Sequence, residues 1–318
     1  MIESVDIDFG LENVWKSWFD FRKGKKSSSE IEWFEYNLER ELAKLSTELM
    51  DGSYHLQKYR QFMVYENKKR LITVAAVRDR VVQRLVYNYL LPIIDPQLTR
   101  DVWSCRPGKG LLGAITQTQN LLRHNPNGAI VRFDVKQFFA SIDRNILLKL
   151  VKCKIRETKA LGLIQLIITE NTQLPVGIPI GNLTSQILAN LYLNELDRYI
   201  LFQIKPLGYV RYGDDGLLVL GTKTEANQVL QLVNYFLLEK LKLALNPKNT
   251  KICLVKAGAH FLGVEIFSTG LRLKSRVLKE MWENLSAETL SSYFGVVKTK
   301  GTSKNMRYLR WRTVGLTD

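Results

Sequence analysis

The twelve residues from Gly208 to Val219 restrict the fold more than any other segment of this chain. They read Gly-Tyr-Val-Arg-Tyr-Gly-Asp-Asp-Gly-Leu-Leu-Val, with strand-forming residues on both sides of a glycine-flanked pair of aspartates. This pattern predicts a β-hairpin that carries Asp214 and Asp215 at its tip. Two carboxylates about 4 Å apart repel each other by roughly 4 kcal/mol at an effective dielectric constant of about 20. A cation must offset this repulsion, or one carboxyl group must take a proton.

A divalent metal ion is the obvious cation, because hard carboxylate oxygens suit Mg²⁺. Phosphoryl transfer with two metal ions needs carboxylates from at least two strands, so that both ions bridge the attacking and leaving oxygens about 4 Å apart. Residues 130–135 form a predicted strand, and Asp134 near its end is the second source of carboxylate. A lone aspartate at a strand end is usually a turn former, so this assignment depends on the rest of the chain.

The charge of the chain indicates a polyanionic partner. Its 46 lysine and arginine residues outnumber its 31 acidic residues, which gives a net charge of +15. Such a surface attracts nucleic acid, although a generically basic protein is the plain alternative. The cysteines at 105, 153 and 253 and the three histidines show no metal-ligand spacing, which argues against a zinc site and a disulfide framework.

Neither a signal peptide nor a membrane span is predicted. The N-terminus carries Glu3, Asp6 and Asp8 where a leader would be basic and then apolar. No apolar run approaches the roughly 18 residues that a membrane span needs. We therefore expect a soluble protein of the cytoplasm, without a membrane partner.

The remaining periodicities predict an α+β fold. A capping box at Ser29 and Glu32 begins a helix that Gly52 ends. Strands are expected within residues 59–77, and a helix from Asp79 is expected to stop at Pro92. Further helices are expected after the turn at 107–110, from Arg144, from Leu183 to Tyr199 and from Glu225 to Leu243, with two short strands around residues 261–263 and a helical C-terminal part. This order differs from the regular βαβ alternation of a doubly wound sheet.

Five segments resemble, in order and at the family's spacing, the catalytic motifs of reverse transcriptases. They are residues 132–143 (Arg-Phe-Asp-Val-Lys-Gln-Phe-Phe-Ala-Ser-Ile-Asp), 177–194, 212–215 (Tyr-Gly-Asp-Asp), 245–251 (Leu-Asn-Pro-Lys-Asn-Thr-Lys) and 260–263 (His-Phe-Leu-Gly). The resemblance covers roughly residues 50–275. It implies a right-hand polymerase fold whose parts are residues 1–130 (N-terminal region and fingers), 131–275 (palm, an antiparallel sheet with helices and a fingers insertion at about 145–175) and 276–318 (short helical thumb).

The resemblance implies an RNA-directed DNA polymerase that acts on template RNA, a cDNA or primer strand and dNTPs. Its catalytic residues would be Asp134, Asp214 and Asp215, which together with Val135 would bind two Mg²⁺ ions, with Mn²⁺ as a substitute. By the same resemblance, the residues that contact the dNTP would be Lys69, Arg70, Phe138, Phe139, Ile180 and Gly181. Within this set, Phe139 matches the residue that crowds the sugar 2′ position and Phe138 competes for that role. The residues that contact primer and template would be Tyr212, Gly213, Arg78, Lys298, Arg307 and Arg310.

The second motif resembles one subgroup, the reverse transcriptases of diversity-generating retroelements. Most reverse transcriptases have Gln-Gly, three residues and Ser-Pro, whereas this chain has Ile180-Gly181 and then Ser185-Gln186. Subgroup members copy a template RNA with errors concentrated at adenines and use a small basic, oligomeric accessory protein. We assign fidelity to Ile180 and Gln186, because isoleucine can pack against a nucleotide but cannot hydrogen-bond to it.

Two alternatives remain open. The chain could serve another bacterial lineage, such as a retron, a group II intron or a phage-defence system, or it could be a catalytically idle nucleic-acid scaffold. Two positions also depart from the family pattern. Gly213 stands where relatives carry a larger residue, and Asn249 stands where they carry the lysine of a Lys-Thr pair.

Overall fold

A computed structural model describes residues 6–65, 69–169, 176–273 and 301–313, together with residues 278, 279, 281, 283, 297 and 298. The chain divides into two compact units. Unit 1 comprises Met1–Thr99, Gln137–Glu195 and Glu239–Leu243, and unit 2 comprises Arg100–Lys136, Leu196–Leu238 and Ala244–Asp318. Within the described ranges, no helix combines the length and the apolar character that crossing a bilayer requires.

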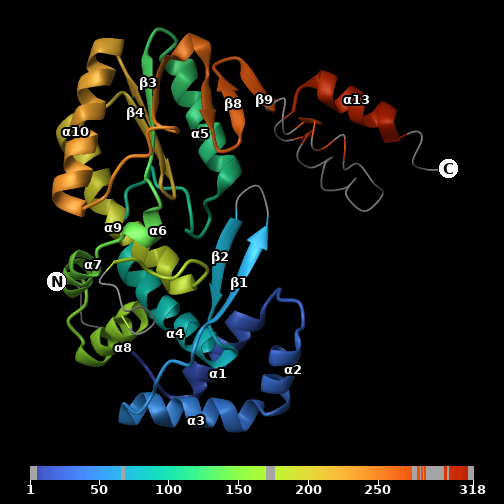
Figure 1. Ribbon diagram of the computed structural model, residues 1–318, viewed down its shortest axis with the longest axis vertical. Coiled ribbons are helices and arrows are strands. Elements are labelled where there is room, and N and C mark those ends of the chain that lie inside the picture. Colours follow the sequence, from blue (N-terminus) through green and yellow to red (C-terminus); the bar gives the residue numbers. More distant parts are fainter. Residues whose placement is uncertain are drawn as a thin grey trace. The chain divides into compact units, whose positions relative to one another are not determined.

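Unit 1 is mainly helical, and its described residues include a β-hairpin (Figure 1). Its hairpin pairs β1 (Arg60–Tyr65) with β2 (Lys69–Val74) in antiparallel register. Its core includes Trp18, Leu42, Leu45, Leu85 and Leu90, all 2% exposed or less. The helices are α1 (Leu11–Arg22), α2 (Ser29–Tyr36), α3 (Leu38–Asp51), α4 (Val77–Ile94), α6 (Phe138–Ser141), α7 (Arg144–Lys152) and α8 (Thr158–Thr169), with the 3-10 turn η1 (Asp95–Gln97).

The single helix predicted from Ser29 to Gly52 is wrong in its middle and at its start. Asn37 has φ −105° and ψ 19°, and its side-chain amide donates to the Trp33 carbonyl oxygen at 3.0 Å, so it ends α2 and precedes α3. The N-cap is Ser28, whose hydroxyl accepts from the Ile31 N–H. Gly52 ends α3 in the left-handed region at φ +78°, as glycine does most readily. The break escaped prediction because the apolar periodicity continues across it.

The prediction that Pro92 stops a helix is also wrong. Helix α4 begins at Val77 and continues through Pro92 to Ile94. Proline removes one backbone donor and strains the preceding turn, but this proline lies in the last turn of α4. The helix then tightens into η1, where Pro96 follows within two residues of the end of α4.

Unit 2 is built on an antiparallel sheet of four strands in the order β4-β5-β3-β6. In Figure 1, α5 lies on one side of this sheet and α10 on the other. The strands are β3 (Ala129–Asp134), β4 (Gly208–Tyr212), β5 (Asp215–Leu220) and β6 (Lys251–Leu254), and a second sheet holds β7 (Ala259–Phe261), β8 (Val264–Phe267) and β9 (Gly270–Leu273). The helical elements are α5 (Leu111–His124), η2 (Ile200–Ile204), η3 (Val255–Ala257) and α13 (Ser303–Thr313), while α9 (Leu183–Tyr199) and α10 (Lys223–Leu241) contribute residues to both units.

Burial on both faces explains why the central strands are almost continuously apolar. Leu217 and Val219 on one face of β5 pack in a cluster with Ile115 of α5, whereas Leu218 and Leu220 on the other face are equally inaccessible. A sheet covered on both sides needs apolar side chains at successive positions, so polar residues in these strands stand out. The predicted α+β class is confirmed, as are the hairpin, α9 and the two short strands around residues 261–263. The division into residues 1–130, 131–275 and 276–318 stays a prediction.

Candidate active site

The predicted hairpin is present, and its register brings the three aspartates together at one end of the unit 2 sheet. Tyr212 of β4 pairs with Asp215 of β5, which leaves Gly213 and Asp214 as a two-residue turn. On the other side of β5, Asp134 of β3 lies directly opposite Asp215. Directly opposite residues of an antiparallel pair place their Cβ atoms about 4.5–5.5 Å apart on the same face.

Asp215 is held by an arginine of the neighbouring strand. The Arg132 Nε atom donates to Asp215 Oδ1 at 2.9 Å, and its Nη2 atom donates to Asp215 Oδ2 at 3.0 Å. Both side chains are 19% exposed. A bidentate guanidinium–carboxylate pair is among the stronger charge-assisted contacts, and here it engages both oxygens of Asp215.

Asp134 is held by two neutral amides. The side-chain amides of Asn246 and Asn249 both donate to Asp134 Oδ2, at 2.7 and 2.8 Å. The Asn246 backbone N–H also donates to the Asp134 carbonyl oxygen at 2.7 Å. The loop before β6 therefore encloses one oxygen of Asp134. The other, Oδ1, accepts no side-chain hydrogen bond within the described part of the chain.

Of the three aspartates, Asp214 is stabilised least by its neighbours. Burial raises the pKa of Asp214 to about 6, and the nearby charges of Asp134 and Asp215 add to this effect. The backbone hydrogen bond at Asp214 and the charge of Arg211 act in the opposite direction without cancelling it. The carboxylate receives no hydrogen bond from another described side chain. A half-buried carboxylate in this state is suited to accept a cation.

The turn that carries Asp214 is fixed at both peptide groups of Gly213. The Gly213 N–H donates to Ser104 Oγ at 2.7 Å, and Arg211 Nη1 donates to the Gly213 carbonyl oxygen at 2.8 Å. Gly213 itself has φ +65°, a region that glycine enters without the cost other residues bear. The left-handed backbone gives one physical reason for glycine at this position.

Arg211 is in turn held by Asp197 at the end of α9. Its Nε and Nη2 atoms donate to Asp197 Oδ1 and Oδ2 at 2.7 and 2.6 Å, and the Tyr209 hydroxyl also donates to Oδ1 at 2.7 Å. No role was predicted from the sequence for Arg211, Asp197, Ser104 or Arg132. For Arg211 a signal was present, because an arginine between Val210 and Tyr212 interrupts an otherwise buried strand.

The donor set fits a divalent ion shared with substrate phosphates. Among the described residues, no group of three or more His, Cys, Asp and Glu side chains is placed to hold a metal ion alone. Mg²⁺ in polymerase-type sites, however, binds one or two carboxylates and completes its coordination with water and phosphate oxygens. Asp134 Oδ1 and the Asp214 carboxylate supply such a set. The half-buried amides of Asn246 and Asn249 orient Asp134 without neutralising it, and burial raises the pKa of Asp214 to about 6.

Unit 1 carries the residues predicted to contact the dNTP. Phe138 is 3% exposed and is a core residue, whereas Phe139 is half-buried, and the two rings meet edge to face at 5.4 Å between centroids. The Phe139 carbonyl accepts from the Ile178 N–H at 2.8 Å, which ties it to the turn before α9. In that turn Ile180 is 48% exposed and Gly181 has φ +105°.

The segment after that turn is anchored by a tyrosine. The Asn182 side-chain amide donates to the Tyr59 hydroxyl at 3.0 Å, and the Gln83 amide donates to the same oxygen at 3.3 Å. Asn182 and Gln83 are both buried. Gln186, the second predicted fidelity residue, is half-buried in the first turn of α9.

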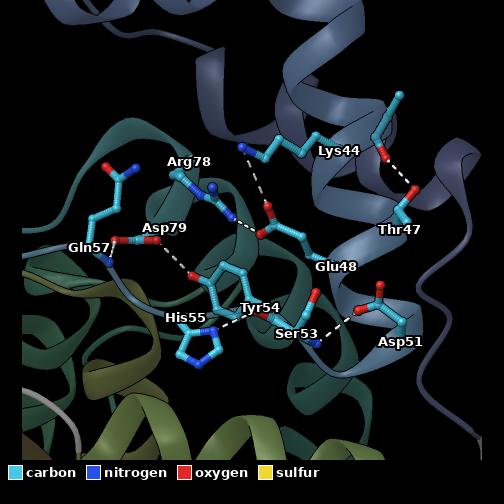
Figure 2. Close-up of polar contacts among 11 residues, drawn as sticks. Lys44, Thr47, Glu48, Asp51, Ser53, Tyr54, His55, Gln57, Arg78 and Asp79 are labelled. Carbon is cyan, nitrogen blue, oxygen red and sulfur yellow. Dashed lines mark hydrogen bonds and ion pairs between the residues drawn. The ribbon is translucent and has the colours of Figure 1, made fainter.

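The basic residues predicted to contact the dNTP, primer or template differ in their exposure. Lys69 and Arg70 lie in β2, opposite Tyr65 and Val64, and their side chains lie outside the described structure. Figure 2 shows Arg78 paired with Glu48, and its guanidinium lies 5.4 Å from the centre of the Tyr54 ring. Only 11% of the Arg78 side chain is exposed. Lys298 and Arg307 are exposed, and the Arg310 side chain lies outside the described residues.

Comparison with known proteins identifies the family of this chain. Residues 57–266, more than half of the chain, match the family described as Reverse transcriptase (RNA-dependent DNA polymerase). Protein YkfC of Escherichia coli is 26% identical over 310 residues, covering 82% of this chain and 81% of YkfC. The group II intron-encoded protein LtrA of Lactococcus lactis is 24% identical over 328 residues, covering 79% of this chain but 54% of LtrA. The telomerase of Candida albicans, solved with a fragment of telomeric RNA, shares the fold with a TM-score of 0.55 at 14% identity, over 82% of this chain and 54% of the telomerase.

Proposed function

This chain belongs to the reverse transcriptase family of RNA-directed DNA polymerases, and we propose that it copies the template RNA of a diversity-generating retroelement with errors at adenines. The observation that carries the polymerase activity is the meeting of Asp134, Asp214 and Asp215 at one end of the unit 2 sheet. Divalent ions bound there would activate the primer 3′-hydroxyl and neutralise charge on the triphosphate. Asp134, Asp214 and Asp215 would hold these ions at the end of the sheet.

For the incoming nucleotide, we assign the 2′ position to Phe139. The burial of Phe138 in the core supports this choice, because a residue 3% exposed has no surface to offer a sugar. Lys69 and Arg70 would contact the triphosphate. Gly181 would allow the backbone to approach the nucleotide closely, since it carries no Cβ and stands at φ +105°.

Polymerase activity is tested by primer extension on an RNA template with Mg²⁺ and dNTPs. The wild-type chain should extend the primer and Asp214→Asn should not, because the turn then lacks its charged oxygen. Asp51→Asn, which neutralises an exposed carboxylate at the end of α3, is the control and should retain activity. An extension-deficient wild-type chain that still binds primer–template would instead favour the idle scaffold.

Assignment of the chain to this subgroup depends on Ile180. It is 48% exposed, so its apolar side chain is available to a nucleotide, and it can supply packing but neither donor nor acceptor. A polar residue at this position would brace the template or the incoming base through a hydrogen bond. Isoleucine cannot form that hydrogen bond, so a mispair opposite adenine persists until it is extended.

The subgroup assignment is tested by sequencing cDNA made on an adenine-containing RNA. The wild-type chain should misincorporate mainly at adenines, and Ile180→Gln should lower that rate. Ile180→Leu, which stays apolar, should keep it high. An adenine error rate that is the same in wild type and Ile180→Gln would contradict the role of Ile180.

A group II intron lineage is the second candidate, and the similarity to LtrA favours it. The two candidate functions differ in the partners of the protein. The retroelement reading includes a small basic, oligomeric accessory protein and a dedicated template RNA, whereas an intron lineage would act with an intron RNA. Exposed Lys304, Arg307 and Tyr308 on α13 support contact with an RNA backbone and stacking on its bases in either case. High fidelity at adenines in the wild-type chain would favour the intron lineage.

A further inference from the structure

We propose that Tyr59 is a positioning residue for base selection, because its hydroxyl fixes one side of the turn that presents Ile180 to the incoming nucleotide. Tyr59 acts on the nucleotide only through Asn182 and the turn. The contact between Ile180 and the nucleotide belongs to the proposed function, on which this role of Tyr59 depends. The placement of the turn itself depends on hydrogen bonds within unit 1.

The turn that carries Ile180 is held on both sides. On the side of lower residue number, the Ile178 N–H donates to the Phe139 carbonyl oxygen at 2.8 Å. On the other side, the Asn182 side-chain amide donates to the Tyr59 hydroxyl at 3.0 Å. Ile180 lies midway between these two contacts in sequence, so the position of its side chain depends on both.

The two contacts differ in kind. The first joins backbone groups, which every sequence possesses, whereas the second depends on one side-chain hydroxyl. Two amides converge on that hydroxyl, from Asn182 at 3.0 Å and from Gln83 at 3.3 Å, and these residues are only 3% and 2% exposed. A buried donor that loses its acceptor is costly, so the Tyr59 oxygen holds both amides in place.

Tyr59 is itself placed by one face of α4. Asp79 and Gln83 are four residues apart and therefore neighbours on the helix surface, and both are buried. Asp79 accepts from the Tyr54 hydroxyl at 2.7 Å and from the Gln57 N–H at 2.9 Å, as Figure 2 shows. Asp79 and Gln83 thus hold the segment that leads to Tyr59 along α4. This contact explains why a carboxylate and an amide are buried among the apolar residues of the helix.

This arrangement sets the turn in place before a nucleotide arrives. Ile180 is 48% exposed, and Gly181 at φ +105° is a flexible point in the backbone next to it. A binding group that is ordered in advance loses less conformational entropy when its ligand binds. Without the Tyr59 hydroxyl, the nucleotide should bind more weakly, because its binding must also order the turn.

The first measurement needs no polymerase activity. It is hydrogen–deuterium exchange of the full chain, read by mass spectrometry over residues 177–190, which hold the turn and the start of α9. Tyr59→Phe keeps the ring and removes only the hydroxyl, and it should speed exchange there by about fivefold or more. Unchanged exchange in Tyr59→Phe would overturn the proposal.

Tyr54→Phe is the matched control for this measurement. It also removes a buried tyrosine hydroxyl from the same segment, but the Gln57 N–H still holds Asp79 and Tyr59 keeps its own partners. Exchange in residues 177–190 should therefore stay at the wild-type rate. Equal acceleration in the two variants would mean a general loosening of unit 1 and would also overturn the proposal.

The second measurement is primer extension with dTTP opposite a template adenine. Tyr59→Phe should raise the KM for dTTP several-fold, up to about tenfold, and change kcat by less than about twofold. A variant that is merely less stable has fewer active molecules, which lowers kcat at an unchanged KM. Tyr54→Phe should keep the wild-type KM, and a lowered kcat with unchanged KM in Tyr59→Phe would contradict the positioning role.

Two double variants test the route from Tyr59 to base selection. Asn182→Ala removes the other half of the same contact, so Tyr59→Phe with Asn182→Ala should raise KM no further than either change alone. Ile180→Gln should lower the adenine error rate in the wild-type background but not in the Tyr59→Phe background, where position 180 is no longer held. Additive KM effects, or an equal drop in errors in both backgrounds, would each contradict the proposal.

The proposed function can fail separately from this role. If Ile180→Gln leaves the adenine error rate unchanged in both backgrounds, the fidelity role of Ile180 is wrong, and the KM for dTTP still tests Tyr59. If the wild-type chain extends no primer, the polymerase activity is wrong, and faster exchange in Tyr59→Phe but not in Tyr54→Phe still supports Tyr59 as the residue that holds the turn.

Discussion

Arg211 and Asp197 form a bidentate ion pair in which both side chains are completely buried, and the same guanidinium holds the turn that carries Asp214. The pair therefore links the end of α9 to the hairpin of β4 and β5 through one planar group. Burying two charges is costly, and geometry of this quality is what offsets the cost. Four predictions concern this hairpin and its neighbours.

Breaking the buried pair should destabilise the protein strongly. Asp197→Ala leaves the Arg211 guanidinium buried without its counter-ion, and the expected loss is about 3–5 kcal/mol in the free energy of unfolding. Urea denaturation of the purified chain measures it. Arg272→Ala is the matched control in the same unit, because Arg272 pairs with Glu265 but is 60% exposed, and it should cost at most about 1 kcal/mol. Similar losses in the two variants would contradict the burial argument.

Removing the Ser104 hydroxyl should disturb the turn without unfolding the chain. Ser104→Ala leaves the Gly213 N–H without that acceptor, which should cost about 1–3 kcal/mol and raise the Mg²⁺ concentration needed for half-maximal primer extension. Ser46→Ala removes a buried hydroxyl of unit 1 that donates to the Phe9 carbonyl at 2.8 Å. It should lower stability similarly and leave the Mg²⁺ dependence unchanged. A shift in Mg²⁺ dependence in both variants would mean that the effect is general.

The two glycines around the aspartates should respond differently to alanine. A Cβ on Gly216 would lie 2.2 Å from the Phe133 ring, so Gly216→Ala should cost about 3 kcal/mol or more and disrupt the β3–β5 pairing. A Cβ on Gly213 meets nothing within 4 Å, and only its φ of +65° opposes substitution. Gly213→Ala should therefore cost about 1–2 kcal/mol and retain primer extension. Thermal unfolding and extension assays on both variants check this order, and a Gly213→Ala chain less stable than Gly216→Ala would reverse it.

The stability of the metal-free protein should fall as Asp214 ionises. Folding raises the pKa of Asp214 from 3.8 to about 6, so the folded state binds this proton more tightly than the unfolded state. Between pH 4 and pH 6 the folded state therefore loses stability as pH rises, by on the order of 2 kcal/mol. Urea denaturation in EDTA across this range should show the fall in wild type and a smaller one in Asp214→Asn. Parallel curves for the two proteins would contradict it, and added Mg²⁺ should stabilise the wild type more at pH 7.5 than at pH 5.

The local parts of the site were predictable from sequence because their signals are local. The hairpin follows from strand-forming residues around Gly213 and Asp214, and α9 was predicted at about its observed bounds. The helix break at Asn37 was missed because the backbone leaves the helical region at this one residue while the apolar spacing continues.

The supporting contacts were missed because they join residues far apart in the chain. Arg132 reaches an aspartate 83 residues away, and Asn246 reaches one 112 residues away. Neither pairing produces a periodic pattern in the sequence. A single polar residue at a strand end or in a loop can serve many different roles. Only the sheet register, which sets β3 between β5 and β6, brings these residues together.

The order β4-β5-β3-β6 also has a consequence for how the chain is made. All three aspartates have been synthesised once the ribosome passes Asp215, but the amides that orient Asp134 lie at positions 246 and 249, just before β6. A nascent chain that stops in between contains all three aspartates without the loop that orients Asp134. The contacts that orient Asp134 can therefore form only after residue 249 has been synthesised.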